Sequence, residues 1–232
     1  MSLPYFLTPD PLSGVLTGPE AAHAHVKRIA PGERIMLTDG TGLAVEVEVT
    51  QASKSEVRGG VVAQTRVPAP SPRVTVVQAI PKSERAELAV DLAVQGGADA
   101  VVPWISHRTI ARWPENKQAK QVEKWRNQAA ASAKQARRAW VPEVREPVTT
   151  NQLAELTRGV QALVLHEDAE VSVRDVELAE DIWLIVGPEG GIGEDELALI
   201  GGTPVRLGPE VLRTASAAFA GLAAIGALSG RW

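Results

Sequence analysis

The sequence contains no cysteine and few aromatic residues, with one Tyr, two Phe and six Trp among 232 residues. Without cysteine the chain forms no disulfide, holds no metal through thiolates and uses no cysteine nucleophile. The longest apolar run, residues 215–228, is rich in alanine and too short to cross a bilayer. The first residues show no basic stretch followed by an apolar one, as a secretory signal would. These absences predict a cytoplasmic protein with no membrane partner.

Charge is distributed unevenly along the chain, although the net charge is only −4. Residues 108–145 hold ten basic and three acidic residues, a charge of +7, which leaves −11 on the rest. A basic surface on an acidic body is expected of a protein that docks on a polyanion in one orientation. Four Trp, which can stack on unpaired bases, lie in or beside this segment: Trp104, Trp113, Trp125 and Trp140. The segment indicates a nucleic-acid contact; a solvated basic helix whose Trp side chains pack inward is the alternative.

A proline-rich segment separates two regions with different patterns. Residues 1–70 contain short β-branched or alternating segments and a hairpin signal at residues 39–42, which predict a small β-barrel. Residues 67–72 hold three prolines and indicate a stiff linker. Residues 71–232 alternate strands and helices, which predicts an α/β fold with a mostly parallel sheet. The strands expected there are residues 74–80, 100–105, 162–166, 182–186 and 205–207, and a long helix from Pro114 to Arg138 carries the basic segment.

A glycine-rich turn, residues 187–191, follows the apolar segment 182–186. In open α/β sheets, ligands bind beyond the carboxyl ends of strands. Neither G-x-G-x-x-G nor G-K-[ST] fits this turn, and acidic residues 194–196 open the next helix, where they would repel a phosphate. The turn therefore suits S-adenosylmethionine (SAM), which carries a sulfonium cation and no phosphate. A purely structural turn is the alternative.

Together with Leu207-Gly208 and Val211-Leu212-Arg213, the turn Gly187-Pro188-Glu189-Gly190-Gly191 resembles the C-terminal pattern of a known family. That family is the bacterial 16S rRNA uridine-N3 methyltransferases, the RsmE family of the SPOUT superfamily. Further matches lie along the chain: His23, Val26, Arg28, Gly32, Asp39, Gly40, Gly42, Gln135, Arg138 and residues 141–143. The chain departs from the pattern at Ala131, Glu210 and Ala215-Ser216.

The resemblance implies a PUA-like β-barrel RNA-binding domain over residues 1–70. Over residues 71–232 it implies a SPOUT methyltransferase domain with a C-terminal trefoil knot. It further implies SAM as cofactor, no metal, a homodimer with the site at the subunit interface, and 16S rRNA in the 30S subunit as substrate. The residues expected at the cofactor are Leu165, His166, Glu167, Gly187, Pro188, Glu189, Gly191, Ile192, Leu207, Gly208, Leu212 and Arg213.

Methylation at uridine N3 needs help in removing a weakly acidic proton. Arg213 and Arg138 are expected to stabilise the uracil anion or hold phosphate, and Glu189 or His166 to accept the proton. The residues expected to contact RNA are Arg28, Arg108, Arg112, Lys134, Arg137 and Arg138. Methylation of pyrimidine C5 usually passes through a cysteine adduct, so a base nitrogen or a ribose oxygen remains as the target. Two alternatives stay open: a SPOUT ribose 2′-O-methyltransferase acting on tRNA or rRNA, and a non-catalytic RNA-binding ribosome assembly factor.

Overall fold

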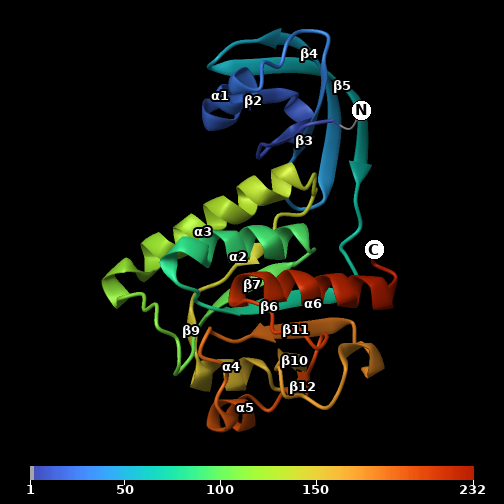
Figure 1. Cartoon of the computed structure of the whole chain (residues 1–232). Coiled ribbons are helices and arrows are strands. Elements are labelled where there is room, and N and C mark those ends of the chain that lie inside the picture. The colour runs from blue at the N-terminus through green and yellow to red at the C-terminus, as the bar shows by residue number, and fades with distance from the viewer. Residues whose placement is uncertain (1–2) are drawn as a thin grey trace. The chain divides into compact units, whose positions relative to one another are not determined.

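The proline-rich segment marks one boundary between two units of the chain in the computed structural model, which describes residues 3–232 apart from the side chains of Ser83 and Glu84 (Figure 1). The first unit runs to Ala69 and also takes in Ala133–Val141. The second unit consists of Pro70–Ser132 and Pro142–Trp232. The sequence pattern predicted the boundary near residue 70 but not the return of the chain into the first unit.

The first unit is a five-stranded sheet with strand order β1-β3-β4-β5-β2. Alternation of apolar residues along β3 and β4 buries one face of the sheet around Phe6 and Leu16. No ladder among the described residues joins β1 to β2, so the pairing runs from one edge to the other without closing the expected barrel. Its elements are β1 (Tyr5–Leu7), η1 (Pro11–Ser13), β2 (Val15–Thr17), α1 (Gly18–Val26), β3 (Arg34–Thr38), β4 (Leu43–Ala52) and β5 (Glu56–Arg66).

The returning segment is bonded to the β3–β4 hairpin of the first unit. The Val141 amide donates to the Gly40 carbonyl (2.9 Å), and the Gly42 amide donates to the Ala139 carbonyl (3.0 Å). Both glycines have positive φ, and a Cβ on Gly42 would lie 2.7 Å from the Trp140 ring. The two glycines that form this hairpin therefore also allow residues 133–141 to pack closely against it.

The second unit is built on a seven-stranded sheet with order β12-β10-β11-β6-β7-β8, in which β9 also pairs with β7. Every ladder in it is parallel, as the alternating pattern predicted. Its strands are β6 (Arg73–Ala79), β7 (Ala100–Ile105), β8 (Glu143–Val144), β9 (Val148–Thr149), β10 (Gln161–Leu165), β11 (Asp181–Val186) and β12 (Thr203–Val205). The strand expected at residues 205–207 thus ends at Val205, which leaves Leu207 in a loop.

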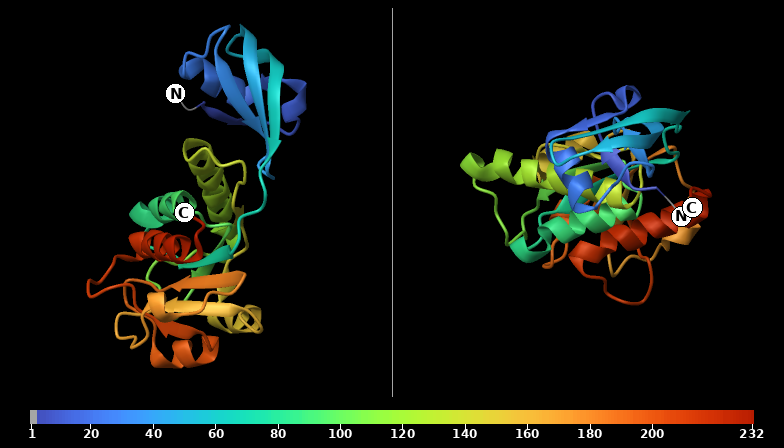
Figure 2. Two further views of the ribbon diagram at one scale, coloured as in Figure 1. Left: turned by 90° about the vertical axis from the view of Figure 1, so that its right-hand side faces the viewer. Right: turned by 90° about the horizontal axis from the view of Figure 1, so that it is seen from above.

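Helices cover both faces of this sheet (Figures 1 and 2). Helices α2 and α6 pack against each other on one face, and α4 and α5 pack on the other. The helices are α2 (Ser83–Gln95), α3 (Glu115–Gln135), α4 (Thr150–Leu156), η2 (Val173–Asp175), α5 (Glu194–Ile200) and α6 (Thr214–Ser229). None of the helices described is long and apolar enough to span a membrane.

The register of the parallel strands decides where the site forms. Leu165 at the end of β10 is level with Val186 of β11 and with Val205 of β12. Because the carboxyl ends of parallel strands meet at one edge, the three loops that follow must lie together.

Candidate functional site

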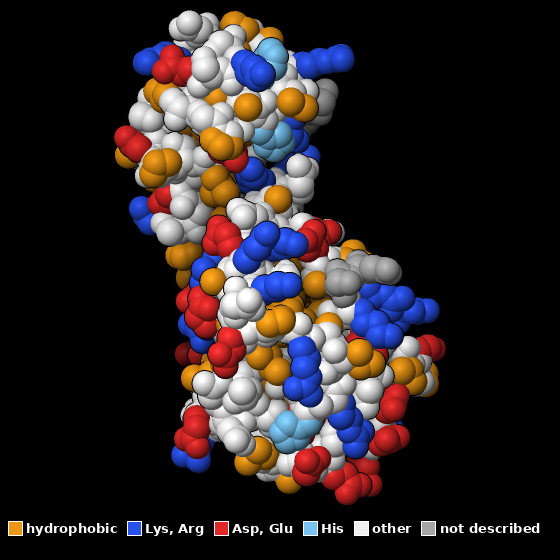
Figure 3. Space-filling view, turned by 90° about the vertical axis from the view of Figure 1, so that its left-hand side faces the viewer, with side chains coloured by type: hydrophobic (Ala, Val, Ile, Leu, Met, Phe, Trp, Pro, Cys, Tyr) orange, Lys and Arg blue, Asp and Glu red, His pale blue; other side chains and the backbone are white. Residues whose placement is uncertain are grey.

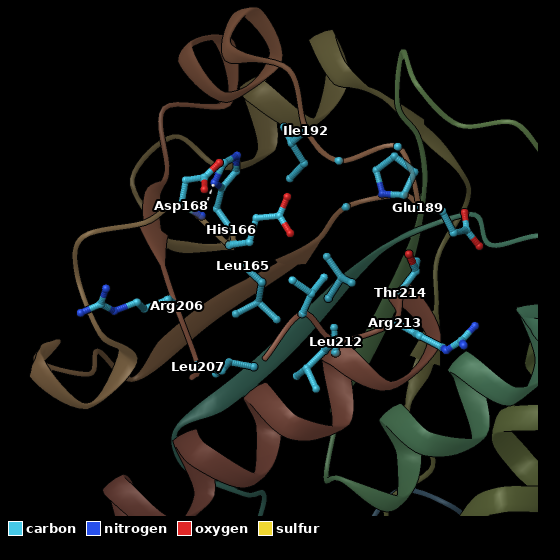
Figure 4. Close-up of a pocket in the computed structure, with 18 of the residues that line it drawn as sticks. Leu165, His166, Asp168, Glu189, Ile192, Arg206, Leu207, Leu212, Arg213 and Thr214 are labelled. Carbon is cyan, nitrogen blue, oxygen red and sulfur yellow. Dashed lines mark hydrogen bonds between the residues drawn. The ribbon is translucent and has the colours of Figure 1, made fainter. Parts of the chain in front are cut away.

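Three loops surround a cavity of about 600 Å³ (Figure 4). The first loop follows β10, the second follows β11 and the third follows β12. This volume is within the range of about 300–1,000 Å³ typical of small-molecule sites. All the residues expected at the cofactor line it: Leu165, His166, Glu167, Gly187, Pro188, Glu189, Gly191, Ile192, Leu207, Gly208, Leu212 and Arg213. The structure therefore brings together two motifs that lie about fifteen residues apart in the sequence and a third segment farther upstream.

The glycines of the second loop are required by local packing. A Cβ on Gly187 would lie 2.7 Å from Cγ1 of Ile192, whose side chain points into the cavity (Figure 4). Gly191 has a φ of 71°, and its amide donates to the Pro188 carbonyl (3.0 Å) to close the turn. The absence of side chains on these glycines thus lets the backbone turn sharply while Ile192 lines the cavity.

His166 joins the first loop to the third, because its amide donates to the Val205 carbonyl (3.0 Å). Its Nδ1 accepts a hydrogen bond from the Asp168 amide (3.3 Å). Glu189, the other residue expected to accept the proton, also accepts a backbone hydrogen bond, from the Lys82 amide to its Oε1 (3.5 Å).

Glu189 and Arg213 lie on one side of the cavity, and His166 lies on the opposite side (Figure 4). Both Glu189 and Arg213 are exposed. Three further arginines, Arg85, Arg108 and Arg206, line the same cavity. Arg85 belongs to α2, more than one hundred residues before the glycine-rich turn, and no motif or spacing in the sequence indicates it. Only the neighbouring positions of β6 and β11 in the sheet bring it there.

Arg138, expected to take part in catalysis, is not among the residues that line the cavity. It follows α3 and belongs to the first unit. Arg28 and Arg137, expected to contact RNA, are exposed in the same unit and adopt positive φ just after α1 and α3. Arg112 is exposed in the loop before α3.

Lys134, expected to contact RNA, is mostly buried and ion-paired. Its side chain is 13% exposed, and its ammonium is paired with Glu20 within the first unit. Burial lowers the pKa of His23, and the charge of Lys134 lowers that pKa further. Because the charge of Lys134 is already paired with Glu20, we expect Lys134 to stabilise the first unit rather than to bind an RNA phosphate.

Two of the four Trp residues expected to stack on bases are buried instead. Trp104 and Trp125 are 0% and 1% exposed, so they belong to the core. Trp113 packs edge-on against Trp125, and the Trp140 indole donates to the Val67 carbonyl. The alternative, in which the Trp side chains pack inward, is correct for Trp104 and Trp125.

Comparison with known proteins gives consistent results for both units. Residues 68–226 match the RNA methyltransferase domain, and residues 16–62 match the RNA methyltransferase PUA domain. The ribosomal RNA small subunit methyltransferase E of Mycobacterium tuberculosis is 43% identical over 229 residues, which cover 94% of this chain and 87% of the relative.

Two solved structures share the fold over 98% of both chains. One is a methyltransferase from Legionella pneumophila in complex with bound SAM, 28% identical with a TM-score of 0.87. The other is the ribosomal RNA small subunit methyltransferase E of Neisseria gonorrhoeae bound to SAM, 27% identical with a TM-score of 0.87. The chain therefore belongs to the RNA methyltransferases and, within them, to the family of ribosomal RNA small subunit methyltransferase E.

Proposed function

We propose that this protein transfers a methyl group from SAM to N3 of a uridine in the 16S rRNA of the small ribosomal subunit. The observation that carries the proposal is the three-loop cavity, whose lining includes both C-terminal motifs of the family. The SAM-bound relatives of the same fold support the choice of cofactor. The absence of cysteine supports a base nitrogen over pyrimidine C5 as the target.

The side chains that line the cavity fit SAM. Leu165 and Ile192 point into it and provide an apolar surface for the adenine ring (Figure 4). The lining carries charges of both signs, the carboxylates of Glu167, Asp168, Glu189 and Glu210 and the guanidiniums of Arg85, Arg108, Arg206 and Arg213. Charges of both signs suit SAM, which has a cationic sulfonium and amino group and an anionic carboxylate. When bound, SAM supplies a methyl group made electrophilic by the sulfonium.

On this proposal, Glu189 accepts the N3 proton, and Arg213 on the same side stabilises the negative charge that develops on the uracil carbonyls. N3 lies on the pairing edge of the base, so the target uridine must be unpaired or flipped out of its stack. In a homodimer with its sites at the subunit interface, Arg138 would help to stabilise the uracil anion or hold phosphate at such a site.

We also propose the trefoil knot implied by the resemblance. β12 lies at the edge of the sheet beside β10, whereas α6 packs on β11 and β6 in its middle. Residues 206–213 must therefore cross back past the loops that follow β10 and β11, with which they share the cavity. Threading of the chain through one of those loops would account for this path, although knots are rare among folds.

The knot is tested by pulling the unfolded chain from its two ends. We expect the stretched length to be shorter than that of 232 residues at about 3.5 Å each, because a tightened knot retains residues. Extension to the full length in every molecule would show an unthreaded chain.

The cofactor site is tested with Gly187→Ala, which places a methyl group against Ile192. We expect the affinity for SAM, measured by calorimetry, to fall about tenfold, equivalent to ~1.4 kcal/mol, because the second loop must shift. Gly60→Ala in β5 is the matched control, since a Cβ there meets no atom within 4 Å. Equal affinities for the two variants would contradict a role of the Gly187 loop in holding SAM.

The reaction is tested by incubating the protein with labelled SAM and small subunits that lack the modification. We expect 3-methyluridine after digestion to nucleosides, with transfer falling steeply as salt rises because basic side chains contact phosphates. A ribose-methylated nucleoside would indicate 2′-O-methylation instead. SAM binding without transfer to any RNA would indicate an assembly factor.

The catalytic roles are tested with Glu189→Gln and Arg213→Ala. Loss of the proton acceptor in Glu189→Gln should lower kcat about 100-fold. Raising the pH should restore part of that loss, because more of the uridine is already deprotonated. Arg213→Ala should lower kcat by a similar factor at every pH, because charge stabilisation is lost. Glu170→Gln, exposed and outside the cavity, is the matched control; a Glu189→Gln variant as active as this control would exclude Glu189 as the base.

A further inference from the structure

The loop between β7 and α3, residues 106–114, has a base that is fixed by buried polar contacts. The His107 amide donates to Oε1 of Glu196 (2.9 Å), and the Thr150 hydroxyl donates to the same oxygen (2.7 Å). Glu196 is 0% exposed. The hydroxyls of Ser106 and Thr109, both buried, are 2.9 Å apart. These bonds hold residues 106, 107 and 109, so the outer residues of the loop project from a fixed base.

The same loop lies against the glycine-rich turn of the cofactor cavity. The Arg108 guanidinium donates to the Gly190 carbonyl (3.3 Å), and Arg108 itself lines the cavity. A Cβ on Gly190 would lie 3.4 Å from Cβ of Arg108, so the two backbones approach closely. This single bond leaves Arg108 with further N–H donors for a ligand.

At the outer part of this loop an apolar side chain stands between two cations. Ile110 is 67% exposed, and Arg108 and Arg112 on either side of it are exposed as well. Figure 3 views the molecule from the side where this loop and the start of α3 lie in Figure 1, and it shows basic, acidic and hydrophobic side chains intermixed over that face. Single exposed hydrophobic residues are common. Here, however, the apolar group is held by a fixed loop beside the cofactor cavity.

We propose that Ile110 inserts into the base stack of the RNA in place of the target uridine, while Arg108 and Arg112 hold the flanking phosphates. The proposal rests on the proposed function, in which the target base must leave its stack to expose N3. An apolar wedge offsets part of the cost of unstacking, as proteins that bend or open nucleic acids show. Ile110 is thus a substrate-positioning residue, and Glu196 holds it in place through His107.

The test compares Ile110→Ala with the wild-type protein in methyl transfer to small subunits that lack the modification. We expect kcat to fall about tenfold or more. Without the apolar side chain, nothing replaces the stacking contacts of the target base, so its flipped-out state is less populated. KM should change less than about twofold, because the phosphate contacts remain. The affinity for SAM should not change. Ile110→Leu, which keeps the apolar volume, should retain most of the activity.

Two further variants distinguish insertion of Ile110 from the loss of a phosphate contact and from the loss of any exposed apolar side chain. Arg112→Ala should raise KM and reduce the slope of log KM against log salt by about 1, as expected for one lost phosphate contact. Leu199→Ala is the matched control, because Leu199 is an exposed apolar residue on α5 outside the cofactor cavity, and we expect wild-type kinetics for it.

The proposal is wrong if Ile110→Ala retains the wild-type kcat, if Ile110→Leu is as impaired as Ile110→Ala, or if Leu199→Ala loses as much activity. The wild-type reaction reports separately on the proposed function. No transfer by the wild type would refute both the function and the wedge, whereas 3-methyluridine formed equally by the wild type and Ile110→Ala would refute the wedge alone.

Discussion

The site depends on the parallel alignment of β10, β11 and β12. Because Leu165, Val186 and Val205 are level with one another, the segments that follow them leave the sheet at one edge and enclose the cavity together. In an antiparallel arrangement, neighbouring strands would end at opposite edges and the three loops could not meet. Strands β10 and β11 are apolar and buried on both faces, which gives the loops a rigid base.

Buried polar contacts connect this edge of the sheet to its surroundings. Glu196, in the first turn of α5, accepts hydrogen bonds from Thr150 of α4 and from the backbone of His107 after β7. The acidic start of α5 that excluded a phosphate on sequence grounds thus also has a structural role. One of its carboxylates complements the helix dipole from inside the protein and ties three segments together.

Much of the second unit was predictable because its apolar strands are short, continuous and bounded by clear turn or helix signals. The two C-terminal motifs located the cavity, since every residue expected at the cofactor lines it. Residues placed by tertiary contacts were not predictable. Arg85 reaches the cavity through the strand order, and Lys134 is paired with Glu20, far away in the sequence. The position of Trp104 beside the basic segment suggested that it stacks on bases, but Trp104 is buried. The sequence does not show to which face of a strand an indole points.

The return of residues 133–141 into the first unit has a consequence for the synthesis of the protein. The carbonyl of Gly40 and the amide of Gly42 receive their partners from Val141 and Ala139. When translation has produced only the seventy N-terminal residues, these groups face water, and the hairpin lacks the Trp140 ring that packs against it. These contacts can form only after more than half of the polypeptide has left the ribosome. A fragment cut at the proline-rich segment would keep the apolar core around Phe6 and Leu16 but would leave this end of the hairpin exposed to water.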